Sequence, residues 1–320
     1  MDKAITLRPV DIDQDFAQLA ALFTLEDEPI SEPALIEDYE AHKDRIFSLK
    51  VAEDELGELL GFNWGTHTRF NETEAYIFII VKPQHRRQGV GRMLFQDLER
   101  SAKSAGIQRL DANIRDNRPE CLSFVLACGF KERTHSLGME LDLSSFDDRL
   151  YDETLARLKS EGFQFTSMDK LGNTEEAQRK LYALNDMTGL ETPGAEGVQS
   201  WLDFEDFQKK VCQSSWYKPA GQMVVIDTIT GEWAAMSAIT RFEGAEYAYN
   251  LHTGVDKRYR NRKLAQAVKT LALRFARQEL GVTIVRTNNN SLNQPMKAIN
   301  RKFGYLPAQG SYLMEKILLL

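Results

Sequence analysis

The sequence has few cysteines and histidines, and their spacing excludes several kinds of site. The 320-residue chain has three cysteines, and no two of them form a Cys-x-x-Cys pair. An odd number without paired spacing gives neither a disulfide framework nor a zinc site, so we expect a reducing, cytoplasmic environment. The five histidines are scattered and do not form His-Glu-x-x-His. We therefore expect no metal cofactor.

Long hydrophobic runs and an excess of positive charge are also missing. The N-terminal residues MDKAITLRPV contain no basic stretch followed by an apolar run, so we expect no signal peptide. The C-terminal ILLL is too short to span a bilayer. The formal net charge of -7 disfavours binding to nucleic acid or to an anionic membrane. We expect a soluble monomer or homodimer whose length suits two domains.

One pattern is present twice in the sequence. Landmarks recur at a nearly constant separation of about 175 residues, as expected for a duplicated domain. The matched landmarks are Arg86 with Arg260, Gly106 with Gly281, Asn117 with Asn293, and Gly129-Phe130 with Gly304-Tyr305. The polar stretch DLSSFDD lies where the copies should join. We place the domain boundary there, which gives domains of residues 1–146 and 147–320.

Each copy alternates strand and helix patterns, which predicts an α/β fold with a mixed sheet. In the first copy strands are predicted at residues 5–10, 46–52, 59–66, 75–81, 107–114 and 137–143. In the second copy they are predicted at residues 163–168, 223–228, 233–242, 248–255, 282–287 and 312–319. Helices are predicted at residues 17–22, 119–127, 151–159, 175–188 and 295–303, and after residues 91 and 263.

A glycine-containing loop precedes the amphipathic helix of the first copy. Its sequence is HRRQGVGR, from His85 to Arg92. A helix N-terminus has unpaired N–H groups that suit phosphate, and glycines let a ligand approach the backbone. With arginines as counter-charge, the loop predicts pyrophosphate binding. The alternative is an ordinary helix start with glycines for packing and arginines for solubility. Neither GxGxxG nor GxxxxGK[ST] is present, which excludes those two nucleotide-binding motifs.

The loop resembles a family signature. RRQGVG fits the Q/R-x-x-G-x-G/A signature of the GNAT superfamily of acyl-CoA N-acetyltransferases. Val81-x-Pro83, the asparagines after the next strand and Gly129-Phe130 fit as well, and NSLNQPMKAINRKFGY looks like the corresponding segment in the second copy. The resemblance covers essentially the whole chain and is similar in plan to tandem members such as mycothiol synthase. It implies two tandem GNAT domains, acetyl-CoA as cosubstrate and an amine acceptor.

The resemblance also implies a set of CoA-binding residues. In this family the strand before the loop separates from its neighbour, and the pantetheine arm of CoA lies in the gap. The matching first-copy residues are Ile79, Ile80, Val81, Arg86, Arg87, Gln88, Gly89, Val90, Gly91, Arg92 and Asn117. The second-copy residues are Thr253, Gly254, Val255, Arg260 through Ala265, and Asn293. Lys263 replaces the first glycine there, so we expect the first copy to hold acetyl-CoA better.

The usual acid and base of the family are missing from both copies. The position of the carboxylate holds Ala75 or Tyr249, and the position of the tyrosine holds Val125 or Asn300. The possible substitutes are Tyr76, Tyr249, His252 and Tyr312, although aromatic residues in strands are also typical of a core. We expect an acetyl-CoA-dependent N-acetyltransferase in which a primary amine of a small molecule or peptide attacks the thioester directly. The alternative is a catalytically weakened CoA-binding sensor or partner-binding module.

Overall fold

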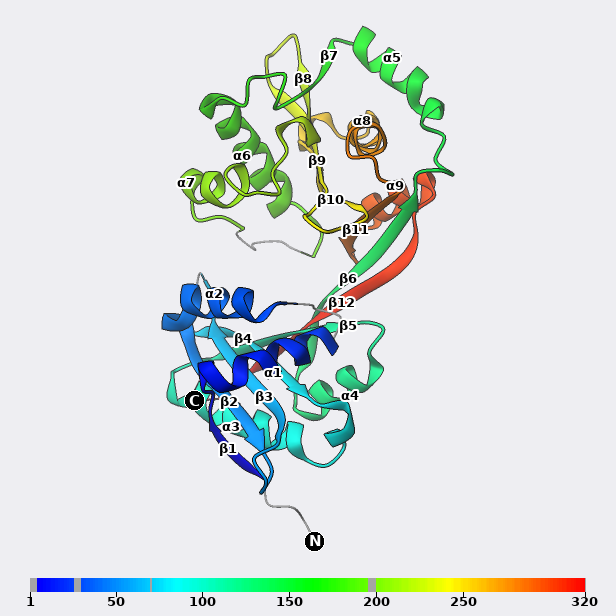
Figure 1. Ribbon diagram of the computed structural model, residues 1–320. Coiled ribbons are helices and arrows are strands. Elements are labelled where there is room, and N and C mark those ends of the chain that lie inside the picture. Colours follow the sequence, from blue (N-terminus) through cyan, green and yellow to red (C-terminus); the bar gives the residue numbers. More distant parts are fainter. Residues whose placement is uncertain (1–4, 26–29, 70, 195–199, 320) are drawn as a thin grey trace. The chain divides into compact units, whose positions relative to one another are not determined.

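The structure, a computed structural model, describes residues 5–25, 30–69, 71–194 and 200–319 (Figure 1). The chain divides into two units, one of residues 1–133 with 312–320 and one of residues 134–311. The fold contains helices and strands in a mixed sheet, as the sequence predicts.

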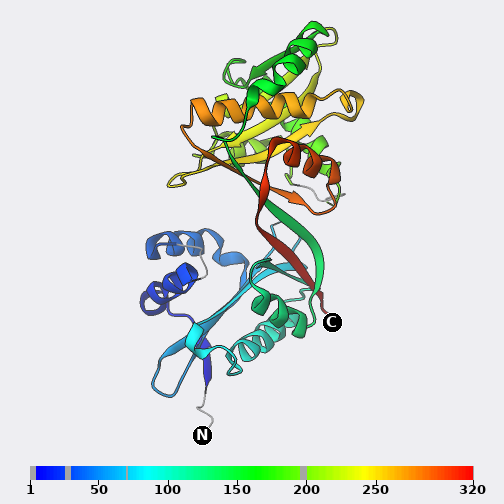
Figure 2. The same ribbon diagram turned by 90° about the vertical axis from the view of Figure 1, so that its right-hand side faces the viewer.

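The first unit is a sheet with helices on both faces. Its elements are β1 (Thr6–Pro9), α1 (Ile12–Leu25), α2 (Glu32–His42), β2 (Ile46–Glu53), β3 (Leu59–His67), β4 (Glu74–Val81), α3 (Val90–Ser104), β5 (Arg109–Arg115) and α4 (Pro119–Ala127). Phe62, Trp64 and Ile80 pack with α1 and α2, while Ala75 and Ile77 pack with α3. This alternation along β4 follows from the two-residue period of a strand. Figure 2 shows the two helical layers with the sheet between them.

The second unit repeats this plan. Its elements are α5 (Asp152–Ser160), β7 (Phe163–Ser167), α6 (Glu175–Leu190), α7 (Phe204–Phe207), β8 (Gln222–Asp227), β9 (Trp233–Thr240), β10 (Ala248–Val255), α8 (Leu264–Gln278), β11 (Ile284–Asn290) and α9 (Gln294–Phe303). Helices α6 and α7 cover one face with Phe207 and Met236 in their core, and α5 and α8 cover the other with Leu158 and Val268. The strand order β7-β8-β9-β10-β11 matches β1-β2-β3-β4-β5.

Each unit is completed by a strand from the other half of the sequence. In the first unit the end of β12 (Leu306–Ile317) follows β5 in the strand order, and Met314 and Leu318 join the core that contains Leu98. In the second unit β6 (Lys131–Asp142) pairs antiparallel with β11 along its whole length. The units therefore differ from the predicted boundary at residues 146 and 147. The assignment of tandem domains to residues 1–146 and 147–320 stays a prediction.

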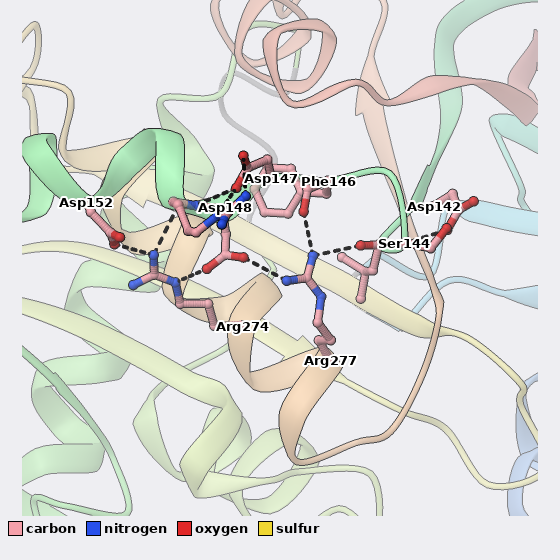
Figure 3. Close-up of polar contacts among 10 residues, drawn as sticks. Asp142, Ser144, Phe146, Asp147, Asp148, Asp152, Arg274 and Arg277 are labelled. Carbon is pink, nitrogen blue, oxygen red and sulfur yellow. Dashed lines mark hydrogen bonds and ion pairs between the residues drawn. The ribbon is translucent and has the colours of Figure 1, made fainter.

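The segment that follows β6 is fixed to α8 by two arginines one turn apart (Figure 3). Arg277 donates to the carbonyls of Leu143 at 2.7 Å and Phe146 at 2.6 Å, and pairs with Asp148 at 2.7 Å. Arg274 pairs with the same carboxylate. The two guanidinium groups hold the pKa of Asp148 below its usual value against the opposing effect of burial. This cluster positions α8. The loop of the second copy, Arg260–Lys263, directly precedes the N-terminus of this helix.

Candidate functional site

The strand before each loop separates from its parallel neighbour. β4 pairs with β5 only at its first three residues, Glu74–Tyr76, although it continues to Val81. β10 pairs with β11 only at Ala248 and Tyr249, although it continues to Val255. The rest of each strand leaves backbone groups on that edge without a parallel ladder. Such a gap can accept an extended ligand, which would complete the missing hydrogen bonds.

The two loops have the same backbone conformation despite different sequences. Arg87 and Asn261 have positive φ values of 62° and 66°, and Gly89 and Lys263 have values of 87° and 69°. Gly89 and Lys263 are the N-caps of α3 and α8. Lys263 therefore holds a left-handed conformation that glycine adopts more readily. Both units therefore keep the loop conformation that leaves the backbone N–H groups of the first helical turn available to a ligand.

In the first unit the loop side chains leave positive charge available. Arg86 donates from Nε to the Val81 carbonyl at 2.9 Å, which ties the loop to the end of β4. Within the described part of the chain, Arg87 and Arg92 form no ion pair. A Cβ at Gly89 would meet nothing within 4 Å, so the helix start is open. Gly91 instead lies against Phe124, 3.4 Å from the position of a Cβ.

In the second unit several cations in and beside the loop are paired with carboxylates. Arg260 repeats the strand contact, donating to the Val255 carbonyl at 3.1 Å. Its guanidinium also pairs with Glu191, next to the end of α6, and Lys257 lies 3.9 Å from the same carboxylate. Arg262 pairs with Glu161 at 3.1 Å. These carboxylates would compete with a phosphate for Arg260 and Arg262.

The predicted catalytic residues of the second unit lie on β10. His252 Nε2 is 2.8 Å from the hydroxyl oxygen of Thr188, which itself donates to the Leu184 carbonyl. His252 therefore donates from Nε2, and its Nδ1 is the nitrogen left as an acceptor. Desolvation lowers the pKa of His252 to about 4, so the ring is neutral at pH 7. Burial raises the pKa of Tyr249 to about 12, which keeps its hydroxyl protonated.

Tyr76, the candidate on β4, lies where the first gap begins. Its side chain is 42% exposed and its cross-strand partner is Asp111 of β5. Burial raises the pKa of Tyr76, and the Asp111 charge acts in the same direction. Asp111 is itself buried and pairs with Arg109 at 3.1 Å and Arg133 at 3.2 Å. Burial raises the pKa of this carboxyl group, and the two arginines oppose that rise.

The remaining predicted residues include some with structural roles. Asn293 accepts a hydrogen bond from the Met296 N–H at 3.2 Å, so it caps α9. Gln88 donates to the Gln84 carbonyl at 2.9 Å. Val90 is buried at the start of α3. Tyr312 packs beside the core of the first unit. Ile79 and Val81 are partly buried on the strand edge that carries the gap.

Sequence reasoning missed several residues that shape the sites. They are Asp111, Glu191, Thr188 and Lys269. Lys269 lies in the buried face of α8, four residues after Ala265 and three before Ala272. A lysine at such a position in an apolar helical stripe is the signal that would have identified it. The roles of Asp111, Glu191 and Thr188 depend on contacts with residues far away in the sequence.

Among the described residues, no group of three or more histidine, cysteine, aspartate or glutamate side chains is placed to hold a metal ion. Over the same part of the chain, helices long and apolar enough to cross a membrane are also lacking.

Comparison with known proteins indicates an acetyltransferase fold. A family model described as acetyltransferase (GNAT) family matches residues 14–130. Curated proteins gave no match. A GCN5-related N-acetyltransferase from Sphaerobacter thermophilus has a TM-score of 0.67 at 15% identity, over 98% of this chain and 95% of that one. A tandem GNAT protein from the clavulanic acid biosynthesis pathway has a TM-score of 0.69 at 18% identity, over 98% of both chains. At these identities the likeness concerns the fold.

Proposed function

Because residues 14–130 belong to the GNAT acetyltransferase family and the chain has the fold of a tandem GNAT protein, we propose that it transfers acetyl groups from acetyl-CoA to a primary amine. Acyl-CoA N-acetyltransferase activity is the general activity of this family. We assign the acceptor to small molecules or peptides and the cosubstrate site to the first unit.

One observation carries this assignment to the first unit. Arg87 and Arg92 surround the open N-cap Gly89 and have no ion pair within the described residues. The pyrophosphate of acetyl-CoA would supply the missing counter-charge at the start of α3. The gap extends from Tyr76 along β4 to Val81, and the loop follows Val81 in the chain, so the pantetheine arm can follow β4 from the phosphates toward Tyr76.

The reaction needs a neutral amine and a proton for the leaving thiolate. The amine nitrogen attacks the thioester carbonyl carbon, the C–S bond breaks, and the amine loses one proton while the CoA sulfur gains one. Backbone N–H groups on the free edge of β4 would stabilise the oxyanion. We propose Tyr76 as the proton donor in the first unit, since its raised pKa keeps the phenol protonated at neutral pH. Tyr249 and His252 are the corresponding candidates in the second unit.

The sensor alternative applies best to the second unit. Its loop keeps the conformation of the first, but Glu191 and Glu161 already neutralise Arg260 and Arg262. A unit of this kind would bind CoA weakly or bind a different ligand. On this proposal the chain has one efficient acetyl-CoA site, and the second unit has a separate binding role.

Paired substitutions in the two loops test the cosubstrate site. Gly89→Glu should abolish acetyl-CoA binding measured by calorimetry, because it places a carboxylate at the helix start where phosphate would bind. Lys263→Glu should leave that binding within about twofold, as expected if the first unit holds acetyl-CoA and the second loop contributes little. Gly231→Glu is the matched control, since Gly231 also has a positive φ and open space around its Cβ. Equal losses from the two loop variants would contradict the assignment.

Turnover is tested separately by the release of CoA thiol. The wild type should release CoA with one class among polyamines, amino acids, aminoglycosides and peptide N-termini, and Gly89→Glu should not. Tyr76→Phe should lower kcat by about 10²-fold, the size typical of a lost general acid, with little change in acetyl-CoA affinity. Binding of acetyl-CoA without turnover of any amine would favour the sensor alternative.

A further inference from the structure

Lys269 is a buried cation with an unusual setting. It projects from α8 of the second unit, its residue is 1% exposed, and among the described residues its ammonium has neither an ion-pair nor a hydrogen-bond partner. Its Nζ lies 4.8 Å from the centre of the Tyr305 ring. Lysine is rarely buried without a counter-ion, because desolvation of the charge is costly. The cation–π contact offsets only part of that cost.

The equivalent position in the first unit is apolar. The constant separation between the two copies makes Phe95 the equivalent of Lys269 and Phe130 the equivalent of Tyr305. Phe95 and Phe130 form a ring pair with centroids 5.8 Å apart. An aromatic pair in one unit is thus a lysine–tyrosine pair in the other. Because the surrounding fold is the same, the lysine is not required to build this position.

Lys269 lines a cavity in the gap between β10 and β11. The cavity has a volume of about 90 Å³ and is also lined by His252, Thr253, Thr287, Asn289 and Met296. This volume holds several water molecules or a group of similar size. The Nδ2 group of Asn289 is buried and has no acceptor. The charged and titratable groups facing Lys269 are His252 and Tyr305, and none of the described lining residues is a carboxylate.

We propose that this gap is a binding site for a small carboxylate, with the Lys269 ammonium as its counter-ion and the Asn289 amide as a second donor. A single lining cation suits a singly charged anion better than a dianionic phosphate. Two sources share this chemistry, a free carboxylic acid and the acid end of a dicarboxylic acyl thioester. The inference goes beyond the proposed acetyl transfer and does not depend on it.

A direct test follows the protonation of Lys269. In the free protein, desolvation lowers its pKa to about 7. A bound carboxylate favours the ammonium, so saturating propionate should raise this pKa by at least about one unit, tenfold in proton affinity. The probe is the NMR signal of ¹³Cε-labelled lysine, assigned by its loss in Lys269→Gln. Propionamide, the neutral match, should cause no change. An unchanged pKa with propionate would overturn the proposal.

A second arm separates the two sources. Calorimetry compares succinyl-CoA with acetyl-CoA on the full chain carrying Gly89→Glu, so that the first loop does not contribute. Preferential binding of succinyl-CoA by at least about tenfold, lost in Lys269→Met but kept in the exposed control Lys302→Met, would identify an acyl group as the source. Propionate binding without that preference would identify a free acid. Neither arm uses an amine acceptor, so failure of the acetyltransferase assay would not affect the outcome of either arm.

Discussion

At the residue scale, small differences between matched positions separate the two units. Gly89 and Lys263 share a left-handed backbone, but only Gly89 leaves the helix start bare. Gly254 has the opposite constraint, because a Cβ there would lie 2.3 Å from the Thr188 hydroxyl. That glycine lets α6 approach β10, which fixes the tautomer of His252. A glycine in this fold therefore serves a ligand in one place and helix packing in another.

Lys269 should make stability depend on pH. Its pKa is about 7 in the folded protein and near 10.5 when unfolded. Between these values the unfolded chain binds more protons, so the free energy of unfolding should rise as pH increases from about 7 to 10.5. Lys269→Met removes this contribution, so its stability advantage over wild type should be largest at pH 7 and shrink by pH 10. Urea unfolding in carboxylate-free buffers measures it.

The exposed control for this prediction is Lys302→Met, which should track the wild type at every pH. A constant difference between Lys269→Met and wild type across the range would show that Lys269 ionises in the folded protein as it does when unfolded.

At the element scale, each unit combines a loop with the helix that follows it. Helices α3 and α8 present the same loop backbone, and in both units an arginine fixes it to the preceding strand. Helix α6 supplies the difference, because Glu191 directly after it reaches the second loop. Helix α2 is not among the helices predicted from the sequence. Ser31 accepts a hydrogen bond from the Ala34 N–H and starts that helix, a capping signal visible in the sequence.

Removing the Glu191 carboxylate should release the second loop. Glu191→Gln frees Arg260 and Lys257 for phosphate, so acetyl-CoA affinity of the second unit should increase several-fold at low salt. Calorimetry in the Gly89→Glu background isolates this unit. Glu175→Gln is the matched control, since that carboxylate lies at the other end of α6 and pairs with Arg179. The same gain in both variants would indicate a general charge effect instead.

At the scale of the whole molecule, each unit contains a segment from the other half of the sequence. Residues 312–320 complete the first unit, and β6 completes the second. Gly138 of β6 allows its close contact with β12, where a Cβ would lie 1.9 Å from the Gln309 carbonyl oxygen. A cut at residue 146 would therefore remove the last strand of the first unit and the β6 strand of the second.

A substitution near the C-terminus should destabilise the first unit. Met314 is 0% exposed and lies in the same core as Leu98 of α3, so Met314→Ala should cost about 3 kcal/mol by leaving a cavity. Hydrogen exchange should accelerate in α3 and β5 and change little in α8. Leu319→Ala is the control, since Leu319 is 86% exposed and should shift stability by less than about 0.5 kcal/mol. Faster exchange confined to α8 would disprove the strand assignment.

The sequence by itself determined the local structure and the duplicated plan. The predicted helix at residues 119–127 and strand at residues 248–255 coincide with α4 and β10, because strong periodicity, Pro119 and flanking turns act locally. The glycine and arginine pattern of residues 86–92 likewise predicted the loop, which lies within residues 14–130, the part that the acetyltransferase family model matches. Its positive φ values and open N-cap follow from local geometry alone.

Only the tertiary structure decided which strand completes which unit and which charges meet. The pairing of Glu191 with Arg260 spans 69 residues, and that of Arg133 with Asp111 brings together β6 and β5. The cavity beside Lys269 exists because β10 leaves β11 after Tyr249. Contacts between segments far apart in the chain depend on packing of the whole sheet, and a linear pattern of residue types carries no record of that packing.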